Sequence, residues 1–414
     1  MSESTIAKIL GRRVWDSRGR PTVEAEVMLV GGASGRAIAP AGASTGSGEA
    51  LDLRDGGNSF AGYGVTRAVA NVNGEISAAL KGMEATQQSE IDRTLIQLDG
   101  TTNKRRLGGN ATIAVSLAIA HAAAAAQGVA LWRHLHRGSE VALPRPEVQI
   151  FGGGAHAGRR VDIQDFMVVA AAATSCGQAL EWIAEVYLAA GKLMAESGRL
   201  AGVADEGGYW PQFESNEEGL QMLVRAIERA GFTPGEQVAI SLDIAASEFG
   251  RAGRYHLARD RKALDSDALI DLLLRWIERY PIVSIEDPLA EDDPEGLRRF
   301  TLAAGDRVQI VGDDFLVTSA ERVRAAAALG ACNTLLVKPN QAGTLTETLA
   351  GLEAARAAGW GSIASARSGE SEDVSIVHLA VGWGVKQIKV GSFARSERMA
   401  KWNELLRIEE FLSR

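Results

Sequence analysis

The chain has few cysteines, no block of like charges and no leader-like start. Only two cysteines, Cys176 and Cys332, occur in 414 residues, so no disulfide framework is implied and a reducing compartment is the simplest interpretation. The net charge of −8 argues against a general affinity for nucleic acids or acidic membranes. The first residues, MSESTIAKILG, lack the basic-then-apolar plan of a signal peptide. We therefore expect a cytoplasmic protein that binds neither nucleic acid nor membranes.

One long apolar stretch, residues 111–132, is rich in alanine and could suggest a membrane span. Alanine supplies little transfer energy, and Ser116, His121 and Gln127 interrupt the stretch. Alanine is also the best helix former, and Gly128 is placed to end the helix. The stretch therefore predicts a helix buried between other helices.

The length of the chain and its change of pattern predict two domains. A chain of 414 residues exceeds the roughly 250–300 residues that one hydrophobic core serves. The first part indicates a small α+β domain, with strand patterns in TIAKILGRRVW and TVEAEVMLVGG, a glycine-rich loop and then helices to about His136. The segment SEVALPRPEVQ, with Pro144 and Pro146, is typical of a linker. We place the domains at residues 1–139 and 140–414.

The second part repeats a short buried strand that closes on a charged residue. The segments are VAISLD, IVSIED, VQIVGDD, NTLLVK, SIASAR and QIKVGS, and the charged residues are Asp243, Glu286, Asp313, Lys338, Arg367 and Lys389. Buried strands avoid charge, so each charge needs a partner. From Glu286 onward these residues are 22 to 29 positions apart, which suits one strand, one helix and two loops per unit. The repeat predicts an α/β fold with a C-terminal (β/α) barrel, whose active site lies at the carboxyl ends of the strands.

Three acidic residues, Asp243, Glu286 and Asp313, stand at the ends of successive strands. Carboxylates from adjacent strands suit one hard divalent cation, with Mg²⁺ preferred. Any one acid alone would more often cap a strand or pair with a base. Three in register with two lysines and an arginine favour a metal site instead.

Positive charge is expected at the same edge of the barrel. Desolvation and nearby cations would lower the pKa of Lys338 and let it act as a base. One of the two lysines, Lys338 or Lys389, could remove a proton while the other steadies the anion, and Arg367 suits a phosphate or a carboxylate. The alternative for each lysine is a stem packed on the rim with its ammonium in water.

Three loops carry further candidate groups. The segment ADEGGYWP presents Glu206 on a turn, where it could act as the acid for a leaving group, although an ordinary acidic turn is commoner. Two glycine-rich loops, residues 39–48 and 151–158, carry Ser44 and His156 and could close over a substrate. Each of these two loops alone is weak evidence, because such loops are often linkers and a lone loop histidine is usually solvated.

Taken together, the motifs resemble those of enolases from about Gly11 to Glu410. The similar segments, in order, are WDSRGRPTVEAEV, GASTG, DEGG, SLDIAASEF, SIEDPL, VGDD, KPNQAGTLTET, RSGESED and GSFARSERMAKWNELLRIEE. The resemblance implies a barrel of enolase type behind a smaller α+β domain. It also implies a lyase in which a lysine base works with Mg²⁺ on an enediolate.

The resemblance further implies a role for each site residue. The tighter Mg²⁺ would be bound by Asp243, Glu286 and Asp313, and a second Mg²⁺ site would be completed by Ser44. Lys338 would remove the proton alpha to the substrate carboxylate, and Lys389 would help to hold that carboxylate. Glu206 would assist departure of the 3-hydroxyl. Binding of the substrate would be completed by His156, Arg367 and Ser368, the last two at the phosphate.

The chain departs from the enolase pattern in three places. Asp165 stands for Glu in Gln-Glu-Phe-Met, and Ala366 stands for His in Ser-His-Arg-Ser. Both belong to the hydroxyl end of the site, where Asp165 would be the catalytic position. Gly152 stands where enolases usually have Asn, which would loosen the loop that carries His156.

These departures leave three hypotheses. The first is Mg²⁺-dependent dehydration of 2-phosphoglycerate to phosphoenolpyruvate. The second is an enolase-like lyase acting on a related 2-phospho or phosphonate hydroxy acid with a modified C3 end. The third is a catalytically silent enolase-fold binding protein, against which the intact lysines and metal ligands argue. Because enolases commonly form dimers, we also expect a homodimer or a higher homo-oligomer.

Overall fold

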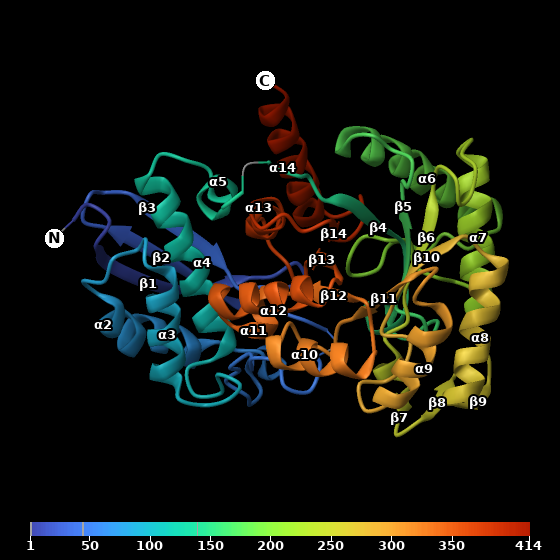
Figure 1. The fold of residues 1–414 in the computed structure, drawn as a ribbon, viewed down its shortest axis with the longest axis horizontal. Helices are drawn as coiled ribbons and strands as arrows, with labels where there is room; N and C mark the ends of the chain where they lie inside the picture. The colour runs from blue at the N-terminus through green and yellow to red at the C-terminus, as the bar shows by residue number, and fades with distance from the viewer. Residues whose placement is uncertain (1, 44, 139) are drawn as a thin grey trace.

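The N-terminal part of the chain forms a small sheet covered by helices. The computed structural model describes residues 2–43, 45–138 and 140–414, and it shows this sheet beside a larger barrel (Figure 1). The sheet is antiparallel in the order β1-β2-β3, with strands Ile6–Trp15, Pro21–Leu29 and Ser34–Ile38. The two strands expected at the start of the chain are confirmed as β1 and β2. A third strand, β3, pairs with the other edge of β2.

The alanine-rich stretch forms the central helix of this part. The helices are α1 (Thr66–Asn71), α2 (Ser77–Leu80), α3 (Gln88–Asp99), α4 (Gly109–Ala126) and α5 (Leu131–Leu135), with a π-helical segment Val72–Ile76 between the first two. In the described residues, α4 is the one helix long and apolar enough to cross a membrane, and 83% of it is buried inside the molecule. Such burial is typical of a core helix.

The expectation that α4 lies between other helices was right about its burial and incomplete about its partners. One face of α4 packs on β2 and β3. A Cβ added to Gly35 of β3 would lie 2.1 Å from the Ala122 nitrogen and 2.3 Å from the Ala118 carbonyl oxygen. Glycine in the strand and alanine in the helix therefore let the two backbones approach closely.

The C-terminal part is a closed barrel of eight strands. Around the barrel the strands are β4 (Arg145–Gly152), β5 (Asp165–Val169), β6 (Ala239–Asp243), β10 (Ile282–Glu286), β11 (Gln309–Gly312), β12 (Thr334–Val337), β13 (Gly361–Ser365) and β14 (Gln387–Lys389). The last six correspond to the six strands expected from the sequence. The (β/α) barrel prediction is confirmed.

The second barrel strand, β5, departs from the simple βα repeat. Only a short 3-10 helix, Gly154–Ala157, separates it from β4. It pairs antiparallel with both β4 and β6, whereas the other neighbouring strands are parallel. Because β5 runs the other way, its first residue lies where the parallel strands end. This reversal brings Asp165, the first residue of β5, opposite Asp243, the last residue of β6.

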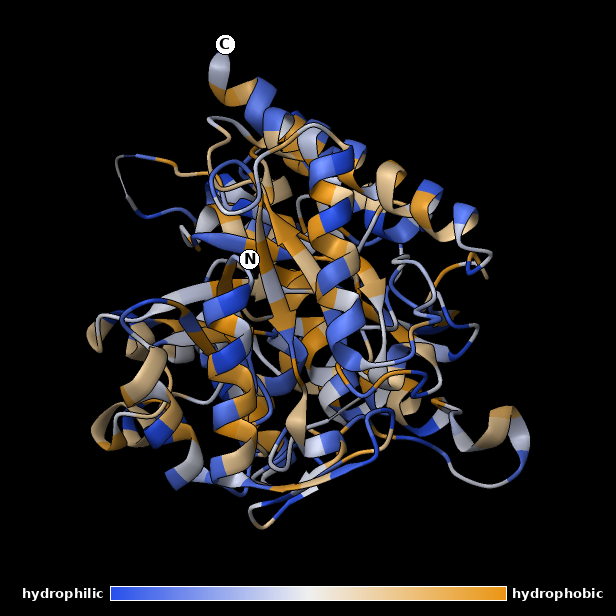
Figure 2. Ribbon diagram, turned by 90° about the vertical axis from the view of Figure 1, so that its right-hand side faces the viewer, coloured by the Kyte–Doolittle hydropathy of each residue, from blue (hydrophilic) through white to orange (hydrophobic). Residues whose placement is uncertain are grey.

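Helices surround the barrel and cover its outer face. They are α6 (Cys176–Glu196), α7 (Asn216–Arg229), α8 (Ser266–Arg279), α9 (Pro294–Ala304), α10 (Ala320–Leu329), α11 (Pro339–Ala342), α12 (Leu345–Ala357), α13 (Ser375–Gly382) and α14 (Ser396–Ser413). In α7, Leu220, Leu223 and Ile227 are buried at the three- and four-residue spacing of one helical face. Figure 2 shows the apolar strands at the centre, with polar residues on the outer helices.

Polar side chains cap the starts of several barrel helices, and a small outer sheet belongs to the same part of the chain. Residues whose side chains accept a backbone N–H at a helix start are Ser175, Ser215, Asp265, Asp293, Ser319 and Thr344. Each satisfies a donor that the first helical turn leaves unpaired. The outer sheet is formed by β7 (Gly250–Arg251), β8 (Arg254–Leu257) and β9 (Lys262–Asp265).

Candidate active site

Three acidic residues meet at the carboxyl edge of the barrel, as the sequence predicted. Asp243 and Glu286 end β6 and β10 and are paired in register, and Asp313 follows β11. All three are almost fully buried. Burial raises the pKa of Glu286 well above its ordinary value, and the Asp243 carboxylate adds to the effect. The Glu286 Oε1 atom is buried and has no hydrogen-bond partner among the described residues, which fits a site built to bind a cation.

Both predicted lysines point into this acidic cluster. Lys338, directly after β12, has its Nζ 2.5 Å from Asp313 Oδ2. Lys389, the last residue of β14, has its Nζ 2.8 Å from Glu286 Oε2 and 3.0 Å from Asp243 Oδ2. The alternative of lysine heads in open water is therefore wrong, because both side chains are buried among carboxylates.

The expected direction of the Lys338 pKa is not found. Burial lowers this pKa, but the nearby carboxylates, Asp313 foremost and then Glu286, together raise it by more, so the net pKa lies above the ordinary lysine value. The sequence argument counted desolvation and nearby cations and could not include an anion 2.5 Å away. A cation bound to Asp313 would neutralise that anion and favour loss of the Lys338 proton.

The predicted anion-binding arginine, Arg367, follows β13 and is held by a carboxylate that the sequence did not single out. Its Nη1 lies 3.1 Å from Glu49 Oε2 and 3.0 Å from Asn340 Oδ1. Ser368 accepts a hydrogen bond of 3.0 Å from Arg18 Nη1 through its Oγ. Glu49 directly follows the glycine-rich loop of residues 39–48 in the N-terminal part, so the end of that loop reaches the barrel. Ser44, on the same loop, lies outside the described residues.

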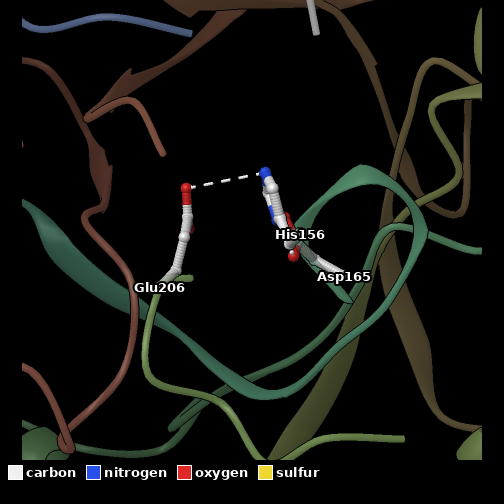
Figure 3. Close-up of side chains that lie close together, drawn as sticks. All are labelled: His156, Asp165 and Glu206. Atoms are coloured by element: carbon white, nitrogen blue, oxygen red, sulfur yellow. Dashed lines mark hydrogen bonds and ion pairs between the residues drawn. The ribbon is translucent and has the colours of Figure 1, made fainter. Parts of the chain in front are cut away.

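A second buried group joins His156, Asp165 and Glu206 (Figure 3). His156 Nδ1 lies 3.0 Å from Asp165 Oδ1, and its Nε2 lies 3.8 Å from Glu206 Oε1. Burial lowers the pKa of His156, but the carboxylates of Asp165 and Glu206 raise it to about 9. The histidine is therefore buried and charged at neutral pH, and it is no solvated loop residue.

The acidic cluster with its two lysines and the group of His156, Asp165 and Glu206 face one narrow cavity. Its walls include His156, Asp165, Glu206, Asp243, Lys338, Ala366, Arg367, Ser368 and Lys389. The cavity volume is about 20 Å³, little more than one water molecule needs. Ion pairs across the cavity make its volume small. Lys389 Nζ, for example, also lies 3.4 Å from Asp165 Oδ2. A substrate must displace some of these pairs to enter.

Two family models match nearly the whole chain. Residues 6–135 match the N-terminal domain of enolase, and residues 140–414 match the C-terminal TIM barrel domain of enolase. The chain belongs to the enolase family. The family supports an enolase-type lyase in general, and the buried lysines, acids and arginine described above lie at the strand ends where the sequence predicted them.

The surroundings of Gly152, one of the three departures from the enolase pattern, could not be foreseen from the sequence. Neighbouring side chains lie where a side chain at this position would stand. A Cβ added to Gly152 would lie 2.6 Å from the Ala204 Cβ and 3.2 Å from both amide atoms of Gln149. The space of the missing side chain is therefore already filled. Ala366 and Asp165 do line the same cavity, as expected.

The sequence analysis did not single out the residues that fix Asp313 in this member of the enolase family. Asp287 accepts hydrogen bonds from the backbone nitrogens of Asp313, at 2.9 Å, and of Asp314, at 2.8 Å. Gln341 donates to Asp313 Oδ1 at 2.8 Å. Asp287, Asp313 and Asp314 form a separate acidic group, whose carboxylate oxygens lie within 4.8 Å of one another. The acidic pairs in SIEDPL and VGDD were the signal that could have revealed them.

Proposed function

We propose that this enolase family member is a Mg²⁺-dependent hydro-lyase that dehydrates 2-phosphoglycerate to phosphoenolpyruvate. The observation that carries the proposal is the burial of Lys338 and Lys389 among carboxylates at one edge of the barrel, within a cavity that Glu206 and Arg367 also line. A proton next to a carboxylate is poorly acidic, so its removal requires concentrated positive charge around the anion that forms. Both lysines and Arg367 supply such charge.

The proposed roles follow from the position of each side chain. Lys338 takes the proton from C2, and Lys389 faces the carboxylate of the resulting enediolate. Glu206 donates a proton to the departing 3-hydroxyl. Arg367 and Ser368 hold the phosphate, for which the planar guanidinium is well suited. Two protein groups thus handle the two proton transfers of the elimination.

The residues present fit Mg²⁺. Asp243, Glu286 and Asp313 offer hard oxygen ligands, and Glu286 Oε1 is a buried acceptor to which no described residue donates. The Lys389 ammonium already lies between Asp243 and Glu286, so this position attracts positive charge. When bound there, Mg²⁺ would supply charge to stabilise the enediolate.

A second candidate is an enolase-like lyase acting on a related acid with a substituent near C3. Two wall positions at the hydroxyl end favour it, since Ala366 presents only a methyl group to the cavity and Asp165 is one methylene shorter than Glu. A wall without the enolase histidine side chain leaves room for a larger C3 end.

Steady-state turnover tests both candidates. The first predicts Mg²⁺-dependent formation of phosphoenolpyruvate from 2-phosphoglycerate, and absence of turnover would reject it. The second predicts low turnover by the parent and a gain in the double variant Ala366→His, Asp165→Glu. Each restored polar contact should contribute on the order of 1–3 kcal/mol to the transition state. Normal enolase efficiency in the parent with no gain in the variant would reject the second candidate.

A further inference from the structure

Gln149 links Asp165 to the turn that carries Glu206, on the hydroxyl side of the cavity. It lies on β4 and is 1% exposed. Its Nε2 donates to Asp165 Oδ1 at 2.5 Å, and its Oε1 accepts from the Gly208 nitrogen at 2.8 Å. Gly208 is two residues beyond Glu206, so one amide group contacts both Asp165 and the turn that carries Glu206.

Two glycines make room for this amide. A Cβ added to Gly208 would lie 2.5 Å from Gln149 Oε1, and a Cβ added to Gly152 would lie 3.2 Å from both Nε2 and Oε1. A side chain at Gly208 would therefore displace the amide, and one at Gly152 would crowd it. Gln149 therefore fills part of the space beside Gly152.

The amide also determines how Asp165 uses its two oxygens. Oδ1 receives both Gln149 Nε2 and His156 Nδ1. Within the part of the chain that the structure describes, Oδ2 has no hydrogen-bond partner, and it lies 3.4 Å from Lys389 Nζ. With Oδ1 fixed from two sides, Oδ2 stays directed toward the lysine side of the cavity.

We propose that Gln149 is a positioning residue for the elimination half of the reaction. It holds the His156–Asp165 pair and the Glu206 turn in one fixed arrangement, and it touches none of the reacting atoms. An amide is required because one end must donate to a carboxylate while the other accepts from a backbone N–H. Glutamate would lose the donor, and leucine would lose both groups. The inference rests on the proposed function, since it assigns Glu206 to the leaving hydroxyl.

The test compares Gln149→Leu with a matched control. Gln309→Leu makes the same change in β11, where Gln309 Nε2 donates to Gln387 Oε1 at 2.5 Å outside the catalytic machinery. Two rates are measured with 2-phosphoglycerate and Mg²⁺, exchange of the alpha proton with solvent and formation of phosphoenolpyruvate. Gln149→Leu should slow product formation about 10- to 100-fold, as loss of an orienting partner typically does, and change exchange much less. Gln309→Leu should leave both rates near those of the parent.

A merely structural role would give a different result. If Gln149→Leu lowers both rates equally, or lowers neither, the positioning role is wrong. If the parent shows no turnover, the proposed function fails, and crystal structures of parent and Gln149→Leu decide the inference. In the variant, the contact between Asp165 Oδ1 and His156 Nδ1 should lengthen and the Glu206 turn should shift. An unchanged His156–Asp165 contact and turn would overturn it.

Discussion

The charged state of His156 gives the sharpest prediction, through the change Asp165→Asn. Asp165 is fully buried and lies 3.0 Å from His156 Nδ1. Asparagine keeps the shape of the side chain but removes the negative charge. The pKa of His156, raised to about 9 in the parent, should then fall toward the ordinary value of 6.5, because burial lowers it and the carboxylates of Glu206 and Asp243 then oppose the decrease without Asp165.

The size of the effect follows from the same pKa. The interval between 6.5 and about 9 corresponds to about 3 kcal/mol of preference for the charged imidazole in the folded protein. Since the folded-state pKa lies above the unfolded value, this stabilisation is fully present below pH 6.5 and is lost as pH rises through about 9. The parent should therefore exceed the variant in free energy of unfolding by more at pH 6 than at pH 10.

Two measurements check this prediction. An NMR titration of the His156 imidazole gives its pKa in parent and variant, and urea unfolding at both pH values gives the stability difference. Asp165→Glu, which keeps the charge, serves as the control and should retain a raised His156 pKa. A parent His156 that titrates near 6.5, or a stability difference independent of pH, would refute the reasoning.

Two further predictions concern residues at and near the carboxyl edge of the barrel. Lys338→Ala should abolish exchange of the alpha proton with solvent, whereas Glu206→Gln should slow elimination more than exchange, because the two groups serve separate proton transfers; exchange at the parent rate in the lysine variant would show that another group is the base. Glu286→Gln should raise the Mg²⁺ requirement sharply and leave the fold intact, because a bound cation would lose one of three carboxylates. Calorimetric titration with Mg²⁺ measures this, and equal affinities would mean that the three acids serve only the structure.

The placement of the main site residues could be predicted because a barrel orders its strands in a regular way. A charged residue at the end of a parallel strand must lie at the carboxyl edge, whatever the details of packing. From that rule alone we predicted that Asp243, Glu286 and Lys389 lie close together, and in the structure Lys389 is within ion-pair distance of both acids. His156 was harder to place, since a loop histidine carries no periodic pattern and its burial depends on Asp165 and Glu206.

Other features depend on contacts that no local pattern contains. The ion pair of Arg367 with Glu49 joins residues 318 positions apart, and the bond from Gln149 to the Glu206 turn spans 59 positions. The pKa of Lys338 rises instead of falling because Asp313, 25 residues away in sequence, lies beside its ammonium. Side chains this far apart become neighbours only when the whole barrel closes.

The sequence by itself determined the barrel, the long buried helix that begins the stretch of residues 111–132, and the chemistry available at the strand ends, because hydrophobic periodicity and strand-end charge are local properties. Only the tertiary structure decided the reversed direction of β5, the filled space beside Gly152 and the direction of the Lys338 pKa. The physical reason is the same in each case. Strand pairing, packing and electrostatic interactions act over a few ångströms in space, and that proximity arises from folding and not from order along the chain.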